Sequence, residues 1–164
     1  MSGLLVIKRA RTVPVDTRLF RQIARLLLGE LLTLEKFELG VHLVRAPEMT
    51  RINETFLQHE GATDVITFDY ADHASRLTPH TLHGELFICH DVAVSQAREF
   101  RTSWPSELVR YLVHGVLHLQ GFDDHRPADR RKMKREENRL LRTLGRRCVI
   151  SQLAVCGVRR PRLT

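Results

Sequence analysis

The segment HGVLHLQGFDDH, from His114 to His125, concentrates side chains that can bind a metal ion. It holds two histidines four residues apart and then, after a glycine, two aspartates and a third histidine. Residues 105–120 are predicted to form a helix, and positions i and i+4 of a helix lie one above the other on one face. His114 and His118 are therefore placed to share one ion, as in zinc sites that are built on helices.

The residues after His118 offer a third ligand. Gly121 is expected to end the helix, because glycine reaches the left-handed backbone region at little cost. The chain can then turn back, which makes Asp123, Asp124 and His125 candidates to complete the site. Three protein ligands with one open position are typical of catalytic zinc sites, where water takes the fourth place. The ion lowers the pKa of that water and makes hydroxide available near neutral pH.

The same segment differs from the metal motif of the zincin peptidases. Those enzymes carry a glutamate directly after the first histidine, where it acts as general base. This chain has Gly115 at that position, so proteolysis is not favoured. Glu107 lies two turns before His114 on a similar face of the helix. We expect it to be an exposed surface residue rather than a partner of the site.

A single α+β domain is predicted to position this motif. The chain has 164 residues, of which 43% are hydrophobic, and this suits one domain with one core. The order of β-type and helix-type patterns predicts one mixed β-sheet packed with helices. Asp16 and Asp91 are expected to cap helices, and Gly61 is expected to end one. Strands are predicted at 4–7, 37–43, 63–68 and 84–89. Helices are predicted at 16–34, from 47 through 56 to the glycine at 61, and at 91–97, 105–120 and 128–144.

The charge of the chain indicates a polyanionic partner. The formal net charge is +7 and the pI is about 10, which favours nucleic acid before membrane. Basic residues of the helix expected at 128–144 could track an RNA backbone, or form a solvated face together with Glu136 and Glu137. These basic residues are Arg130, Arg131, Lys132, Lys134 and Arg135.

Cysteine usage and apolar runs favour a cytoplasmic protein. Cys89, Cys148 and Cys156 form no CxxC pair, which argues against a disulfide framework and fits a reducing cytosol. The N-terminal apolar run is too short for a signal peptide, and no apolar run approaches the ~20 residues that span a bilayer. The predicted domain covers residues 1–145. Residues 146–164 are predicted to be a basic tail, either a flexible arm or a frayed terminus.

At these residues the sequence resembles the YbeY family, the metal-dependent endoribonucleases and rRNA maturation factors of bacteria. The family signature HGxLHLxGYDH resembles HGVLHLQGFDDH in this chain. Two further blocks are similar, namely Asn53 followed by TDVITF at 63–68, and GELFI at 84–88. The blocks keep the order of the family and cover roughly residues 50–125.

The resemblance implies an α+β metalloprotein fold with three histidine ligands to one zinc ion. It also implies single-strand-specific endoribonuclease activity, maturation of the 3′ end of small-subunit rRNA, and a part in ribosome quality control. The expected partner is RNA, small-subunit rRNA and ribosomal particles above all, with no membrane and no DNA.

The resemblance leaves two possibilities for the third ligand. His114 and His118 match the first two family ligands directly. One additional aspartate precedes the last histidine, so Asp124 holds the ligand position in strict register and His125 matches by residue type. Both side chains can bind zinc. We predict His125, because imidazole matches the family ligand and a loop can absorb one residue, and Asp124 stays the alternative.

The chain departs from the family pattern at two positions. Leu57 stands where the family carries an arginine that is thought to handle the phosphate, and Ala62 stands where it carries a proline. Arg51 or His59 could take over from the arginine.

The sequence does not identify a general base or exclude every other function. Asp64, Glu85 and Asp91 are candidate bases, but each also suits a turn, strand-end or cap position. The main competing hypothesis is a ribosome-assembly factor that binds RNA and uses the metal only to hold its fold. A weaker one is a metallohydrolase that acts on a small molecule or a peptide.

Overall fold

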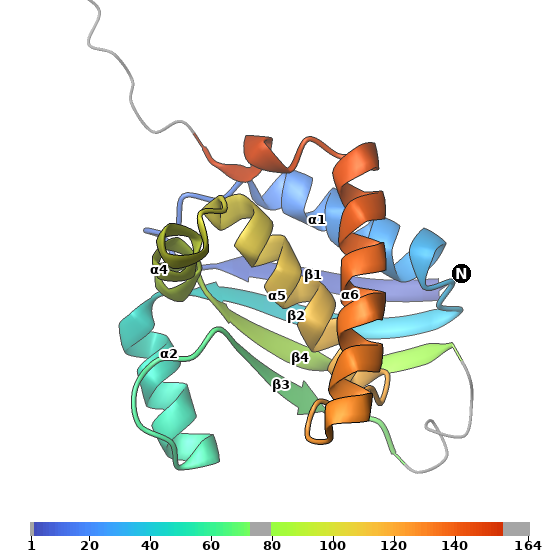
Figure 1. The fold of residues 1–164 in the computed structure, drawn as a ribbon, viewed down its shortest axis with the longest axis horizontal. Helices are drawn as coiled ribbons and strands as arrows, with labels where there is room; N and C mark the ends of the chain where they lie inside the picture. The colour runs from blue at the N-terminus through green and yellow to red at the C-terminus, as the bar shows by residue number, and fades with distance from the viewer. Residues whose placement is uncertain (1, 73–79, 156–164) are drawn as a thin grey trace, which may run out of the picture.

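The computed structural model describes residues 2–72 and 80–155. One four-stranded sheet lies at its centre (Figure 1), with the strands in the order β1 (Ser2–Arg9), β2 (Lys36–Val44), β4 (Thr81–Cys89) and β3 (Val65–Asp69). β1, β2 and β4 run parallel to one another, whereas β3 pairs antiparallel with β4. The prediction of an α+β domain with one mixed sheet is therefore confirmed.

Helices cover one face of the sheet and one end of it. Figure 1 shows α1, α5 and α6 over one face, and α2 and α4 at the end where β2 and β4 finish. None of the helices in the described residues is long and apolar enough to cross a membrane. The helices are α1 (Thr17–Arg25), α2 (Ala46–Ile52), α4 (His90–Phe100), α5 (Trp104–Leu119) and α6 (Pro127–Arg147), with π-helical turns at Leu26–Leu31 and Asn53–Leu57 and a 3₁₀ turn at Ile150–Leu153.

The core forms because the strands alternate between buried and outward-facing side chains. On β2, Phe37, Leu39, Val41 and Leu43 are buried, and the residues between them point to the other face. Leu86 of β4 belongs to the same core, together with apolar residues of α1, α5 and α6. Each fully buried side chain of this size contributes about 1.5–3 kcal/mol. The sheet is thus a fixed platform for α5, the helix that carries the two motif histidines.

Two predicted helix ends are wrong. The helical turn after α2 ends at Gln58, which adopts a left-handed φ of 56°, so Gly61 lies beyond it in the loop. Asp91 lies inside the first turn of α4, whose N-cap is Cys89. Its Oδ2 accepts a hydrogen bond from the backbone N–H of Ala46 at 2.7 Å. This carboxylate is held by a residue 45 positions away, so it joins the starts of α2 and α4 instead of capping its own helix.

The predicted tail begins inside α6. The helix extends to Arg147, so Arg146 and Arg147 belong to its last turn. Leu153 in the following 3₁₀ turn is fully buried, and the next residue forms a β-bridge to the segment before α1. Cys156 and the arginines at 159, 160 and 162 lie outside the described residues. The domain boundary at 145 stays a prediction.

Gly115 allows α5 to lie directly against the sheet. A Cβ atom at this position would lie 2.8 Å from Cδ2 of the buried Leu86 on β4 and 3.3 Å from Cγ2 of Val65 on β3. Protein interiors are close-packed, so such an atom would force its neighbours to move. The missing side chain therefore sets how closely the histidine-bearing helix approaches the sheet.

We expect Gly115→Ala to be less stable than Gly145→Ala, a matched substitution in α6. Alanine favours a helix over glycine by up to about 1 kcal/mol, and a Cβ at Gly145 would meet no atom within 4 Å. At Gly115 overpacking of about 1–3 kcal/mol opposes that gain. Urea unfolding of both variants measures the difference, and equal stabilisation of the two would contradict the packing argument.

Candidate metal centre

The two motif histidines face each other on α5. The Nε2 atoms of His114 and His118 lie 3.0 Å apart, and their ring planes cross at 80°. Both side chains are about a quarter exposed, at 28% and 26%. The i, i+4 spacing thus brings two imidazole nitrogens together on the partly exposed side of a helix whose other residues are mostly buried.

Hydrogen bonds on the far side of each ring set the tautomers. Nδ1 of His118 lies 3.1 Å from the carbonyl oxygen of Phe122, and Nδ1 of His114 lies 3.0 Å from Oε2 of Glu137. A carbonyl oxygen and an ionised carboxylate only accept hydrogen bonds, so both Nδ1 atoms carry a proton and donate it. In the neutral rings both Nε2 atoms are then unprotonated and lie 3.0 Å apart, an arrangement that favours a cation beside them.

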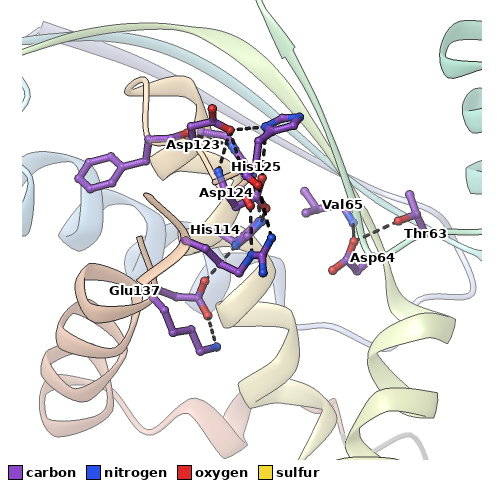
Figure 2. A network of polar contacts seen from close by, with 12 residues as sticks. Thr63, Asp64, Val65, His114, Asp123, Asp124, His125 and Glu137 are labelled. Carbon is purple, nitrogen blue, oxygen red and sulfur yellow. Dashed lines mark hydrogen bonds and ion pairs between the residues drawn. The ribbon is translucent and has the colours of Figure 1, made fainter. Parts of the chain in front are cut away.

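A turn at Gly121 brings Asp124 to the histidines. Gly121 ends the helix as predicted, with a φ of 95° in the left-handed region that glycine favours. Oδ2 of Asp124 lies 3.8 Å from Nε2 of His114 and 3.5 Å from Nε2 of His118. The three donor atoms lie within 4.8 Å of one another, so this group could hold a metal ion. Figure 2 shows Asp124 beside His114.

His125 lies outside this group. Its side chain is 85% exposed, and Figure 2 shows it turned toward Asp123, whose Oδ1 it contacts through Nδ1. That hydrogen bond raises the pKa of His125. Asp123, Asp124 and His125 form a second cluster of ligand-type atoms on the outer side of the loop. The structure thus joins Asp124, and not His125, to the histidine pair.

The loop is held in a register that points Asp124 inward. The backbone N–H groups of Asp124 and His125 donate to Oδ1 of Asp123 at 2.7 and 3.1 Å. The carbonyl of Phe122 is held in turn by His118. In this register the side chain of His125 contacts Asp123, whereas the carboxylate of Asp124 lies near the histidine pair.

Glu137 of α6 is a site residue that the sequence argument missed. One of the two interpretations of this helix placed Glu137 on a solvated face, but its side chain is only 4% exposed. Arg110 Nη1 and Lys134 Nζ donate to its Oε1 at 2.7 and 3.1 Å, and His114 donates to its Oε2. A sequence signal existed, because Glu137 interrupts the apolar stripe of Met133, Leu140 and Leu144.

The pKa values of this pair reflect burial and the shared hydrogen bond. Burial alone would raise the pKa of Glu137, but the hydrogen bonds from His114 and Arg110, with the nearby Lys134, lower it to about 2. The hydrogen bond with Glu137 raises the pKa of His114, although burial opposes this. Glu137 is therefore ionised at neutral pH and keeps the Nδ1 proton on His114.

Glu107 is also buried, and the prediction of an exposed residue is wrong. Its side chain is 6% exposed. Thr102 Oγ1 donates to its Oε1 at 2.8 Å, and Arg110 Nε lies 3.9 Å from its Oε2. Burial is tolerated because a hydroxyl and a guanidinium group partner the carboxylate.

An open cavity of about 570 Å³ lies beside the metal centre. His114 and Asp124 form part of its wall, and so do polar and aromatic side chains of α4, α5 and α6. The other lining residues are Asp64, Gln96, Phe100, Thr102, Glu107, Arg110, Tyr111, Arg130, Met133, Lys134 and Glu137.

Of the three candidate bases, the structure brings Asp64 to this cavity. Glu85 accepts hydrogen bonds from Tyr70 and His42 on the other face of the sheet, and Asp91 joins α2 to α4. Figure 2 shows Asp64 on the opposite side of His114 from Glu137.

The two residues that could replace the family arginine, Arg51 and His59, are not part of the cavity lining. The exposed Arg51 pairs with Glu48 at 3.7 Å, and His59 lines a different, shallow pocket. Leu57 is not among the described residues that line the cavity either.

Comparisons with known proteins agree on one family. The model of the endoribonuclease YbeY family matches residues 7–145. An endoribonuclease YbeY from Chlorobium luteolum is 44% identical over 96 residues, which cover 58% of this chain. The matched part spans 66% of that protein, which is just under two thirds of its length. An endoribonuclease YbeY from Chlorobaculum parvum is 35% identical over 128 residues, which cover 76% of this chain and 83% of that protein.

A solved structure has the same fold. The solution structure of a Thermotoga maritima protein superposes with a TM-score of 0.65 at 22% sequence identity. The match covers 96% of this chain and 99% of the other.

Fold and site together define an α+β protein with a His–His–Asp group that could hold a metal ion beside an open cavity. The family model covers most of the chain, and the histidine block lies within it. This chain belongs to the endoribonuclease YbeY family. The resemblance to this family that the motifs indicated is confirmed.

Replacing Glu137 by Gln should weaken metal binding by about 10–100-fold, because glutamine lacks the negative charge that orients the His114 ring and raises the basicity of its Nε2. Glu136→Gln is the matched control, since Glu136 pairs with Arg139 at 3.0 Å on the exposed side of α6. Zinc titration against a chromophoric chelator gives both affinities. Equal affinities in the two variants would show that Glu137 does not support the centre.

Proposed function

We propose that this protein is a zinc-dependent endoribonuclease that cleaves single-stranded RNA. His114, His118 and Asp124 are the proposed ligands of the zinc ion. One observation carries the proposal, namely that ligand atoms of His114, His118 and Asp124 lie within 4.8 Å of one another and that His114 and Asp124 line an open cavity. Structural zinc sites are closed by four protein ligands, whereas catalytic sites keep one position open. Membership of a family named for endoribonucleases supports RNA as the substrate.

The donor set suits zinc. Two imidazole nitrogens and one carboxylate oxygen are ligand types that zinc binds in catalytic sites with three protein ligands. Asp124 replaces His125 as third ligand in this proposal, because its Oδ2 lies 3.8 and 3.5 Å from the two Nε2 atoms. Glu137 and the Phe122 carbonyl hold the rings in the tautomer that a metal requires.

Asp64 is the proposed general base. A bound ion would polarise the phosphate and lower the pKa of a water molecule. Thr63 Oγ1 and the backbone N–H of Val65 both donate to Oδ1 of Asp64, at 3.1 and 2.8 Å. Oδ2 is then the oxygen that can accept a proton from water in the cavity.

The proposed RNA is small-subunit rRNA in ribosomal particles, with maturation of its 3′ end and ribosome quality control as the cellular roles. The net charge of +7 supports a polyanionic partner. The proposed place of action is the cytoplasm, and the free thiols of Cys89 and Cys148 suit a reducing compartment.

Asp124→Ala should lose zinc and RNA cleavage together, whereas His125→Ala should keep both. Loss of an outer partner already costs about 10–100-fold, so loss of a direct ligand should lower cleavage by at least about 100-fold. Elemental analysis gives the zinc content, and a gel assay with single-stranded RNA gives the cleavage rate. The reverse pattern, with zinc lost only in His125→Ala, would make His125 the third ligand.

His114→Ala should abolish cleavage but leave RNA binding largely intact, because binding to the backbone depends mainly on basic side chains. Fluorescence anisotropy measures RNA binding, and thermal unfolding shows whether the variant keeps its fold. An assembly factor with a structural ion would behave differently, since it would unfold when the ion is lost and would cut no RNA. Normal cleavage by His114→Ala would overturn the nuclease proposal.

A further inference from the structure

Two pairs of basic residues in the first half of α6 lie in different surroundings. Arg130 and Lys134, four residues apart, line the cavity beside the metal centre. Arg131 and Arg135 have the same spacing and are exposed, but they are not among the described residues that line it. The two pairs therefore carry equal charge on one helix in different surroundings.

Arg130 differs from the other cations of the cavity. Arg110 and Lys134 both donate to Glu137, at 2.7 and 3.1 Å, so a buried carboxylate already balances their charge. Arg130 donates only to main-chain carbonyl oxygens in the described part of the chain, from Nε to Asp124 at 3.1 Å and from Nη2 to His125 at 3.5 Å. Its positive charge is thus not balanced by a carboxylate of the described residues.

The anchoring contacts also place Arg130 next to the centre. Asp124, whose carbonyl holds Nε, contributes its carboxylate to the His–His–Asp group. A guanidinium group has five N–H donors in a plane, and the two carbonyls use only part of them. The remaining donors form a fork that suits two oxygens of one phosphate.

The balance of charges in the cavity lining bears on whether Arg130 can bind an anion there. The lining holds one more carboxylate than cationic side chain, with Asp64, Glu107, Asp124 and Glu137 on the acidic side. A divalent ion at the centre would reverse the sign of that balance. Arg130 is then the cavity cation that is free to add a directed contact with an anion.

We propose that Arg130 binds a phosphate of the RNA strand next to the metal centre and so sets how the strand lies in the cavity. The inference rests on the proposed function for its substrate, but it concerns binding, which is measured separately from cleavage. Arg130 is not assigned a part in bond breaking.

The test compares Arg130→Ala with Arg131→Ala, its neighbour outside the cavity lining. Both variants are loaded with saturating zinc, and their zinc content and melting temperature are checked. Binding is measured by fluorescence anisotropy with a labelled 2′-O-methyl single-stranded RNA, whose integrity is verified on a gel. Arg130→Ala should bind about tenfold more weakly, which corresponds to one charge-assisted hydrogen bond. Arg131→Ala should stay within about twofold of the wild type.

Salt dependence separates a phosphate contact from a general loss of structure. The slope of log K against log salt should fall by about 0.7 in Arg130→Ala, the value for one phosphate contact to a single strand. Arg130→Lys should keep the slope and regain only part of the affinity, because lysine keeps the charge but lacks the fork.

Three outcomes decide between the claims. Wild-type affinity and slope in Arg130→Ala, or an equal loss in Arg131→Ala, would overturn the role of Arg130 even if RNA is cleaved normally. Absence of RNA binding by the zinc-loaded wild type would overturn it as well. Arg130-dependent binding without any cleavage would support this inference and overturn the nuclease proposal instead.

Discussion

The hydrogen bond between Glu137 and His114 joins the last long helix to the histidine pair, and much of the site depends on it. A buried carboxylate is costly unless it is fully partnered, and Arg110, Lys134 and His114 supply its partners. The same contact places the proton on Nδ1 of His114 and leaves Nε2 free to bind a cation. This interaction therefore links α6, through the ionised Glu137, to the chemistry at Nε2 of His114.

The scaffold provides the rigidity that such a centre requires. α5 packs on the sheet without a side chain at Gly115, so the two histidines are held by a helix with little freedom to shift. The loop after Gly121 is tied down by hydrogen bonds to Asp123 and by the contact between Phe122 and His118. Asp64 directly precedes β3, and the basic side chains come from α5 and α6. Groups from separate elements therefore meet at one cavity, as enzyme sites commonly require.

Local patterns predicted the parts of this protein that depend on neighbours in the sequence. The alternation on β2, the cap at Asp16 and the end of α5 at Gly121 follow from backbone preferences and periodicity. The same method failed at Asp91, whose carboxylate is held by Ala46 on another helix. It failed again at Glu107 and Glu137, because charged residues are seldom buried and their partners come from other segments.

The sequence by itself determined the histidine pair, the turn after it, the mixed α+β fold and the family. These follow from spacing of a few residues and from motifs that stand in the chain as printed. Only the tertiary structure decided that Asp124, and not His125, lies near His114 and His118. It also decided that Glu137 accepts a hydrogen bond from His114 and that an open cavity lies beside the metal centre. The physical reason is that these features depend on how a loop is pinned and how α6 packs on α5, and packing joins residues that no local pattern relates.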